Sequence, residues 1–523
     1  MFRPFGVSVW RWFSALGLAF LLVSPSDAQE RGASPAPQAA PQTSQPRPQS
    51  QIEPTGEEKT AQAGPESSSS GASNSDQSKS AESKTETRIT PQQAEELFRD
   101  VDTILAFSSK DSSLPIKREV KRRLASREEV VTYLKKNMAE DKDVKRLRRT
   151  ELVLKKFGLL PKDFDLQTFL VSLLEEQVAG YYDSKTKTVN LLDWVVPELQ
   201  RPVLAHELTH ALQDQSFGLD KWLKKGDEDL DTKKNLTPAD ITEDENSEAR
   251  QAVLEGQAMV VLLDYMLAPL HRNVADSPDV VDMLNSDMAS GSADAVQYKN
   301  APIFLKESLT FPYRYGIEFE AEVLRARGKE QAFLAPLQNP PQTSREIMEP
   351  QTYLHGERIA PLPLPDFKKI FKDYDRFDVG AIGEFDVDVL AEQYAGEDAA
   401  KRIYPNWRGG YYYSVHHKHD GNGPLGLVFV SRWASDRTAA QFAAIYARGA
   451  QQRYKNVTAA TGNDLPTDLK SLRSLGGEHT WNTEEGPLVI AVKGDTVLVT
   501  ESLNPQLTAQ FRQAVLVTSA EKN

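Results

Sequence analysis

The sequence of 523 residues contains no cysteine. Disulfide bonds are therefore excluded, and a metal ion can be bound only by histidine, aspartate or glutamate side chains. Attachment of a lipid to an N-terminal cysteine is excluded as well. Histidine is also scarce, with 8 residues in the whole chain. Two histidines at a metal-binding spacing therefore rarely arise by chance.

Positive charge is in deficit, because 62 Lys and Arg residues stand against 75 Asp and Glu residues, for a net charge of −13. This balance argues against nucleic acid or an anionic membrane surface as the main partner. The hydrophobic fraction of 39% is ordinary for a soluble protein. The length is sufficient for two or three domains with cores of their own.

Long hydrophobic runs are missing after the first residues of the chain, so no further membrane span is expected. Residues 1–28 have the pattern of a signal peptide. Arg3 and Arg11 supply positive charge, residues 12–23 form a short apolar core, and Ser26-Asp27-Ala28 offers a cleavage site before Gln29. We therefore expect an exported protein, periplasmic or extracellular. An uncleaved N-terminal anchor is the alternative.

Large apolar side chains are almost absent from residues 29–89, which are rich in Pro, Gln and Ser. Such a segment cannot bury enough surface to order itself, so we expect a disordered linker. Helical patterns predict a helical N-terminal region over residues 90–165, beginning with Thr90 as N-cap and Pro91 at the first helical position. A dense basic cluster in this region is interpreted as a solvated helix face; it consists of Lys117, Arg118, Lys121, Arg122 and Arg123.

The remaining chain divides into two parts at the Pro-rich segment 361–365. Residues 166–360 contain a helix over 166–177, a hairpin around 183–186, a charged stretch over 220–245 expected to be a surface loop, and a helix over 247–268. Residues 366–523 are predicted to form a separate α+β domain with an antiparallel sheet. Its strand-like runs are 410–415, 426–430, 488–492 and 496–500, with helices over 438–454 and 505–517. The predicted fold class is α+β.

The strongest chemical signal is His206-Glu207-Leu208-Thr209-His210. Positions four apart lie on one face of a helix, so both imidazoles can reach one metal ion. Glu207 projects beside that face, where it can polarise a metal-bound water instead of ligating the metal. The alternative is a pair of capping or core histidines around a surface glutamate.

A catalytic zinc site keeps three protein ligands, so one more His or carboxylate is required. The best candidate is Glu255, which lies within an apolar helical segment where an unpaired charge would be costly. Gly256 beside it would let another helix approach closely. Glu248, two helical turns earlier, is the alternative third ligand.

These motifs resemble the gluzincin class of zinc metallopeptidases, in which His-Glu-x-x-His is followed by a glutamate from a later helix. The resemblance extends to uncharacterised exported bacterial gluzincin-like proteins. It implies a mainly helical zincin-like catalytic domain over residues 166–360, with His206, His210 and Glu255 as zinc ligands and Glu207 as general base. An edge strand that aligns substrate is expected near residues 178–182 or 186–192.

The expected activity is hydrolysis of a peptide or protein substrate through a zinc-bound water. The developing oxyanion needs a hydrogen-bond donor, and Tyr313 or Tyr315 is chosen because both are expected in a loop that folds back on the site. Alternatively, both tyrosines simply pack with Phe311 and Pro312. Two other functions stay open: a degenerate metallopeptidase fold that acts as a binding or scaffolding module, and a zinc hydrolase of a non-peptide substrate.

Overall fold

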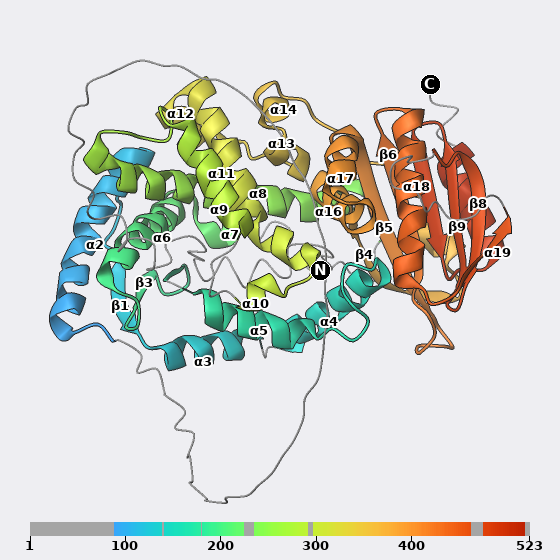
Figure 1. Ribbon diagram of the computed structural model, residues 1–523, viewed down its shortest axis with the longest axis horizontal. Coiled ribbons are helices and arrows are strands. Elements are labelled where there is room, and N and C mark those ends of the chain that lie inside the picture. Colours follow the sequence, from blue (N-terminus) through green and yellow to red (C-terminus); the bar gives the residue numbers. More distant parts are fainter. Residues whose placement is uncertain are drawn as a thin grey trace, which may run out of the picture. The chain divides into compact units, whose positions relative to one another are not determined.

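The computed structural model describes residues 88–138, 141–178, 180–223, 235–290, 296–461 and 474–517. The predicted signal peptide and nearly all of the predicted linker lie outside the described residues. From Arg88 onward the chain forms one compact unit. It combines many helices with two sheets, so the α+β class is confirmed (Figure 1).

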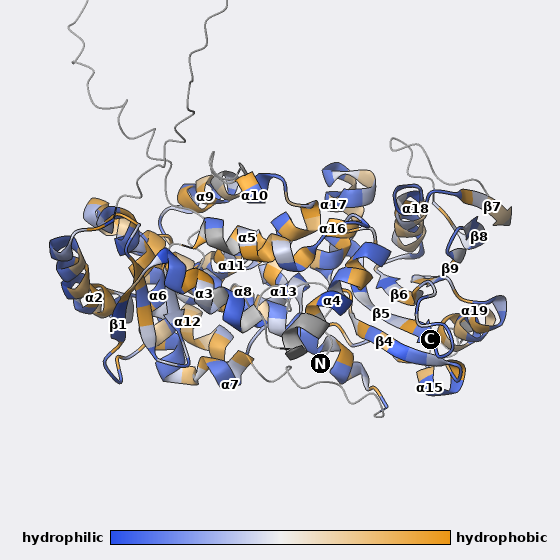
Figure 2. Cartoon of the chain, turned by 90° about the horizontal axis from the view of Figure 1, so that it is seen from below, coloured by the Kyte–Doolittle hydropathy of each residue, from blue (hydrophilic) through white to orange (hydrophobic). Residues whose placement is uncertain are grey.

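Three long helices build the helical part of the molecule. They are α6 (Pro197–Phe217), α8 (Pro238–Leu267) and α11 (Ile303–Arg327). Helix α8 packs against both of the others, and α2 (Pro91–Ser112) packs against α6. Helix α2 begins as predicted, because Thr90 and Gln93 form a capping box ahead of Pro91. Its apolar residues lie on one side and its polar residues on the other (Figure 2).

Helix α8 begins earlier than the sequence predicted. The stretch 220–245 was expected to be a loop, but the helix starts at Pro238 after a capping box between Thr237 and Asp240. Its acidic first turns are therefore helical, and two of their acids, Glu245 and Glu248, are buried. With η2 (Ala268–Leu270), α8 is the one described helix long and apolar enough to cross a membrane. Since 72% of its most apolar window is buried inside the protein, it has the surroundings of a core helix.

A three-stranded sheet with the order β1-β3-β2 lies beside α6. The predicted hairpin is confirmed as the antiparallel pair β2 (Tyr181–Asp183) and β3 (Thr188–Leu192). Strand β1 (Lys121–Ala125) pairs in parallel with β3, so the expectation of a basic helix face is wrong. Arg122 and Arg123 are instead strand residues that pair with Asp102 and Glu129. Of the two segments predicted to supply an edge strand, the first contains the edge strand β2, whereas β3 is central.

Shorter helices surround these elements. They are α3 (Arg127–Met138), α4 (Asp141–Lys156), α5 (Leu166–Gln177), α7 (Leu219–Leu223), α9 (Pro278–Ser290), α10 (Val296–Lys299), α12 (Lys329–Gln338), α13 (Ser344–Met348) and α14 (Pro350–Leu354).

The second sheet is antiparallel and has the order β4-β5-β6-β10-β9-β8-β7. Its strands are β4 (Tyr374–Ala381), β5 (Trp407–His417), β6 (Gly426–Trp433), β7 (Val457–Thr461), β8 (Gly477–Thr483), β9 (Gly486–Lys493) and β10 (Thr496–Glu501). The helices of this part are α15 (Phe367–Ile370), α16 (Glu384–Ala395), α17 (Glu397–Ile403), η3 (Tyr404–Asn406), α18 (Asp436–Arg453), α19 (Pro505–Arg512) and the π-helical turn η4 (Gln513–Val517). The four predicted strands and two predicted helices are present, whereas β4, β7, β8, α16 and α17 were not predicted.

The central strands of this sheet bury both faces. On one face Phe429 packs with α18 and Tyr412 packs with Phe157, while Tyr411 and Val430 belong to the apolar group that includes α15 and α19 on the other. Burial on both faces explains why these strands are nearly continuous hydrophobic runs. Ile241 near the start of α8 belongs to the second group, so α8 contributes to the packing of this sheet as well as to the helical part.

Candidate metal centre

Helix α6 places His206 and His210 on one face, and the residues around them are buried on every side from Val203 to Asp214. The helix begins with Pro197 at its first position and ends at Gly218, whose left-handed conformation (φ 69°) terminates it. A helix buried all round must bury the polar groups of the motif as well, so each of them needs a partner.

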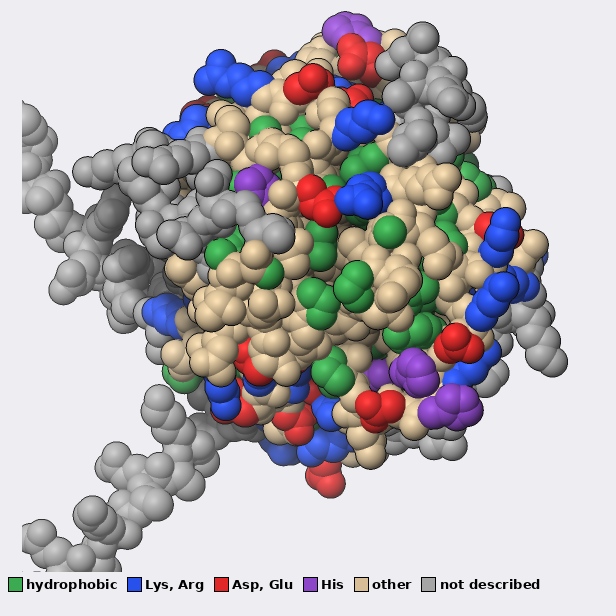
Figure 3. Space-filling view, turned by 90° about the vertical axis from the view of Figure 1, so that its right-hand side faces the viewer, with side chains coloured by type: hydrophobic (Ala, Val, Ile, Leu, Met, Phe, Trp, Pro, Cys, Tyr) green, Lys and Arg blue, Asp and Glu red, His purple; other side chains and the backbone are tan. Residues whose placement is uncertain are grey.

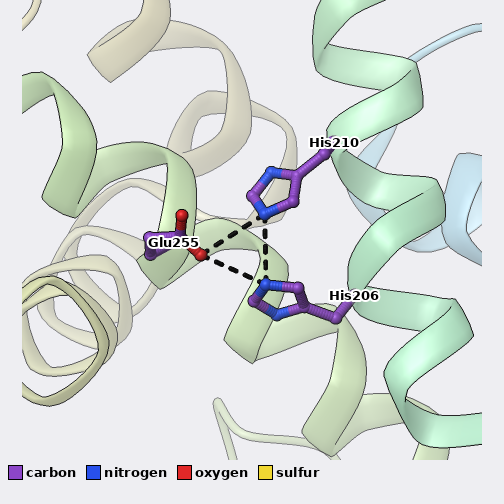
Figure 4. A group of neighbouring side chains, drawn as sticks. All are labelled: His206, His210 and Glu255. Carbon is purple, nitrogen blue, oxygen red and sulfur yellow. Dashed lines mark hydrogen bonds and ion pairs between the residues drawn. The ribbon is translucent and has the colours of Figure 1, made fainter. Parts of the chain in front are cut away.

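Glu255 of α8 meets the two histidines (Figure 4). Its Oε2 atom lies 3.1 Å from Nε2 of His206 and 3.3 Å from Nε2 of His210, and the two Nε2 atoms are 3.1 Å apart. One ligand atom from each of the three residues lies within 4.8 Å of the others, and all three side chains are buried. Two imidazole nitrogens and one carboxylate oxygen can hold a divalent metal ion. Among the described residues this is the one group of three or more such side chains that converges in this way.

The charges of this group are strongly coupled. Burial by itself would raise the pKa of Glu255, but the two imidazoles outweigh burial and lower it to about 2. Burial would likewise lower the pKa of His210, yet the Glu255 carboxylate raises it to about 9. A negative charge at Glu255 is thus favoured at neutral pH, which suits a ligand for a cation.

Glu207 is not part of the converging group, but its carboxyl group interacts electrostatically with both histidines and with Glu255. Its Oε2 atom accepts a hydrogen bond of 2.7 Å from the backbone N–H of Tyr182 in β2. Its Oε1 atom is buried and has no hydrogen-bond partner among the described residues. Burial raises the pKa of Glu207, although both histidines oppose that effect.

The two candidate tyrosines are in helix α11, not in a loop. The expectation of a loop is wrong, because the helix continues through Pro312 and Gly316. Tyr313 is buried, and its ring lies 6.2 Å from the His206 ring at an interplanar angle of 29°. Tyr315 packs against Phe311 at 5.4 Å. Residues two apart on a helix point in different directions, so only Tyr313 contacts the metal group.

Glu248, the alternative third ligand, is not brought to the histidines. Its carboxyl group is 6% exposed and interacts mainly with Asp386 of α16 and Glu245 of α8. Burial raises its pKa well above the usual range, and the neighbouring acids add to the effect. The structure therefore joins Glu255, and not Glu248, to the motif on α6.

Sequence reasoning missed the residues that hold the motif in place. The Tyr182 hydroxyl donates a 2.8 Å hydrogen bond to Oδ2 of Asp214, and Nζ of Lys187 lies 2.7 Å from the same atom. Asp214 follows His210 by four residues and therefore shares its face of α6, a spacing that could have drawn attention to it. Its partners come from the β2–β3 hairpin, and no local pattern identifies them.

A second histidine group lies at the end of β5. His417 ends the strand, and β6 starts at Gly426. The His416 ring packs on Phe377 and the His417 ring on Tyr374, so the two side chains have separate neighbours. Figure 3 shows histidine side chains among acidic and basic ones on the surface of this end of the molecule.

Comparison of the chain with protein-family models, curated proteins and solved structures finds no match.

Proposed function

We propose that this chain is an exported zinc-dependent metallopeptidase of the gluzincin type that hydrolyses peptide bonds in peptides or proteins. The observation that carries the proposal is the position of Glu207. It lies beside three converging ligand side chains without joining them, and its Oε1 atom has no hydrogen-bond partner within the described residues. A carboxylate in that position is free to take up a proton during hydrolysis.

Zinc is the metal proposed for the site. Two imidazoles and one carboxylate are a ligand set found in catalytic zinc sites, and the absence of cysteine excludes the thiolate-rich sets of structural zinc sites. Zinc bound there would supply a Lewis acid that polarises the substrate carbonyl and lowers the pKa of a water molecule.

The chain's own residues would divide the remaining work. Glu207, held by the backbone N–H of Tyr182 through Oε2, would take the proton of the attacking water on Oε1 and pass it to the leaving amine. Tyr313 is the tyrosine proposed to face the developing oxyanion, since its ring contacts His206, whereas Tyr315 packs elsewhere.

One observation favours a second candidate, a binding or scaffolding module with a non-catalytic metal ion. The side chains of the site are nearly inaccessible, with exposed fractions of 3% for His206, 1% for Glu207, 6% for His210 and 1% for Glu255. A polypeptide can reach the site only if neighbouring elements move. A metal ion without turnover would need no such movement.

The Glu207→Gln variant separates the two functions. The amide keeps an oxygen for the Tyr182 N–H but cannot act as a base, so we expect kcat/KM to fall by about 10²–10⁴-fold with zinc content unchanged. Hydrolysis is measured by mass spectrometry on a mixed peptide library and with fluorescein-labelled casein, and zinc by elemental analysis. Glu248→Gln is the matched control, because it makes the same change at another buried glutamate of the helical part and should leave turnover unchanged.

Two results would contradict the proposal. Full activity in Glu207→Gln would remove the assigned base. Zinc-loaded, folded wild-type protein that cleaves no member of the library would leave the scaffolding module as the better explanation.

A further inference from the structure

The two histidines of the metal centre differ in what holds their outer ring nitrogen. Nδ1 of His210 lies 2.8 Å from Oε1 of Gln213, one helical turn further along α6. Nδ1 of His206 is buried and has no hydrogen-bond partner among the described residues. Among the described residues, a hydrogen bond to the outer nitrogen orients the His210 ring but not the His206 ring.

The direction of the His210 hydrogen bond can be traced from helix α12. Nε2 of Gln257 lies 3.2 Å from the backbone oxygens of both Ala332 and Phe333. Carbonyl oxygens only accept hydrogen bonds, so the NH₂ end of the Gln257 amide must face α12. Its Oε1 atom consequently faces Gln213.

The same reasoning fixes the Gln213 amide. Its Nε2 atom lies 3.0 Å from Oε1 of Gln257 and 3.2 Å from the backbone oxygen of Leu254, and both of these atoms are acceptors. Oε1 of Gln213 must then face His210 and accept its hydrogen bond. His210 therefore carries a proton on Nδ1. In the neutral imidazole this leaves the lone pair on Nε2, the atom that faces His206 and Glu255.

We propose that Gln213 is a positioning residue that holds His210 in the tautomer and ring orientation required for metal binding. Gln257 and the two α12 carbonyl oxygens set the direction of its amide. Both glutamines are fully buried, so water cannot replace either hydrogen bond. The inference rests on the metal site of the proposed function but not on peptide hydrolysis.

The proposed site differs from one in which a carboxylate accepts the Nδ1–H hydrogen bond of the ligand histidine. An amide oxygen accepts the Nδ1–H bond without adding negative charge behind the metal ligand. The negative charges that act most strongly on His210 are those of Glu255 and Glu207. The metal ion would retain more of its own charge than it would opposite a His–carboxylate pair.

Zinc affinity tests the proposal independently of turnover. Metal-free protein is titrated with zinc in competition with a chromophoric chelator, and Co²⁺ absorption spectra report the ligand geometry. We expect Gln213→Leu to weaken zinc binding by about 10–100-fold and to change the Co²⁺ spectrum, because outer hydrogen bonds to metal ligands contribute that much affinity. Gln213→Glu restores an acceptor for Nδ1–H and should recover most of the affinity.

Gln200→Leu is the matched control. Gln200 is also buried on α6, but its amide bonds to the backbone of Leu192 and Val195. This variant should lose stability without losing zinc affinity. Gln213→Leu protein that binds zinc as tightly as wild type, with an unchanged Co²⁺ spectrum, would overturn the proposal.

The wild-type protein provides a test that no folding defect can obscure. In zinc-loaded protein labelled with ¹⁵N-histidine, the His210 ring should show a proton on Nδ1 that exchanges with solvent more slowly than the Nδ1 proton of His206. Equal exchange rates, or metal bound at Nδ1 of His210, would contradict the assignment. Failure of wild-type protein to bind zinc or Co²⁺ at all would instead count against the metal centre itself.

Discussion

Glu255 and Glu248 lie seven residues apart on the same helix and are both buried, but their surroundings are opposite. Glu255 meets two imidazoles, and its pKa falls to about 2 despite its burial. Glu248 meets the carboxyl groups of Asp386 and Glu245, and its pKa rises well above the usual range. The surroundings of Glu255 favour a carboxylate that can ligate a cation, whereas those of Glu248 disfavour a negative charge.

The comparison shows that burial does not identify a metal ligand. Removing a carboxylate from water disfavours its charge in both places, and only the partner determines whether the charge persists. For Glu255 the partners come from α6, 45 and 49 residues earlier in the chain. For Glu248 one partner comes from α16, far later in the chain. The sequence favours Glu255 through its apolar neighbours, but it does not reveal the partners that decide the charge of either glutamate.

The largest expected effect is a difference in zinc affinity between variants of the two glutamates. Glu255→Gln removes the anionic ligand. Loss of an outer hydrogen bond to a metal ligand lowers affinity by about 10–100-fold, and we expect this variant to lose more zinc affinity than that. Glu248→Gln should retain one zinc ion per chain with wild-type affinity. Both are measured by chelator competition and elemental analysis. The reverse pattern, with zinc lost from Glu248→Gln only, would transfer the ligand role to Glu248.

A smaller effect is expected from the packing beside Glu255. A Cβ atom at Gly256 would lie 2.1 Å from the backbone oxygen of Gly316 in α11, so Gly256→Ala must push the two helices apart. We expect a loss of about 1–3 kcal/mol in the free energy of unfolding, measured by urea titration. Gly421→Ala is the control, because its added Cβ meets no atom within 4 Å. Equal stability of the two variants would mean that the two helices can move apart without loss of unfolding free energy.

Several parts of the fold follow from local patterns. The His pair, the close approach at Gly256 and the start of α2 all depend on spacing or capping within one element, and the structure confirms these geometries. The buried strands of the second sheet were found because burial on both faces makes them hydrophobic runs.

The errors arise where tertiary contacts override local signals. Strand β1 was predicted to be a helix face because it is rich in basic residues. Its parallel pairing with β3, which is far away in sequence, leaves no local pattern. A loop was expected around Tyr313, but that segment of α11 is buried and helical although it contains Pro312. The acidic start of α8 was expected to be a surface loop because it is rich in charge. Its buried acids, Glu245 and Glu248, face α13 and α16, and no local pattern reveals these partners.

The last expected effect is a dependence of stability on pH at the acidic end of α8. Burial raises the pKa of Glu245 to about 7, although the Ser344 N–H and hydroxyl both donate to its carboxyl group. The acids that surround it are Asp244 and Glu248 of α8, Glu346 of α13, and Glu384 and Asp386 of α16. A carboxyl group in these surroundings favours the protonated form in the folded state.

The sign of the pH effect follows from that preference. Because the folded-state pKa lies above the ordinary value of 4.5, the stabilisation is complete below about pH 4.5 and is lost as the pH rises through about 7. Between pH 5 and pH 8 we expect Glu245 to account for a loss on the order of 1–3 kcal/mol in the free energy of unfolding. Glu245→Gln cannot ionise, so its stability should fall less over this range. Urea titrations of both proteins at each pH measure the difference, and parallel curves would show that Glu245 is already ionised in the folded protein.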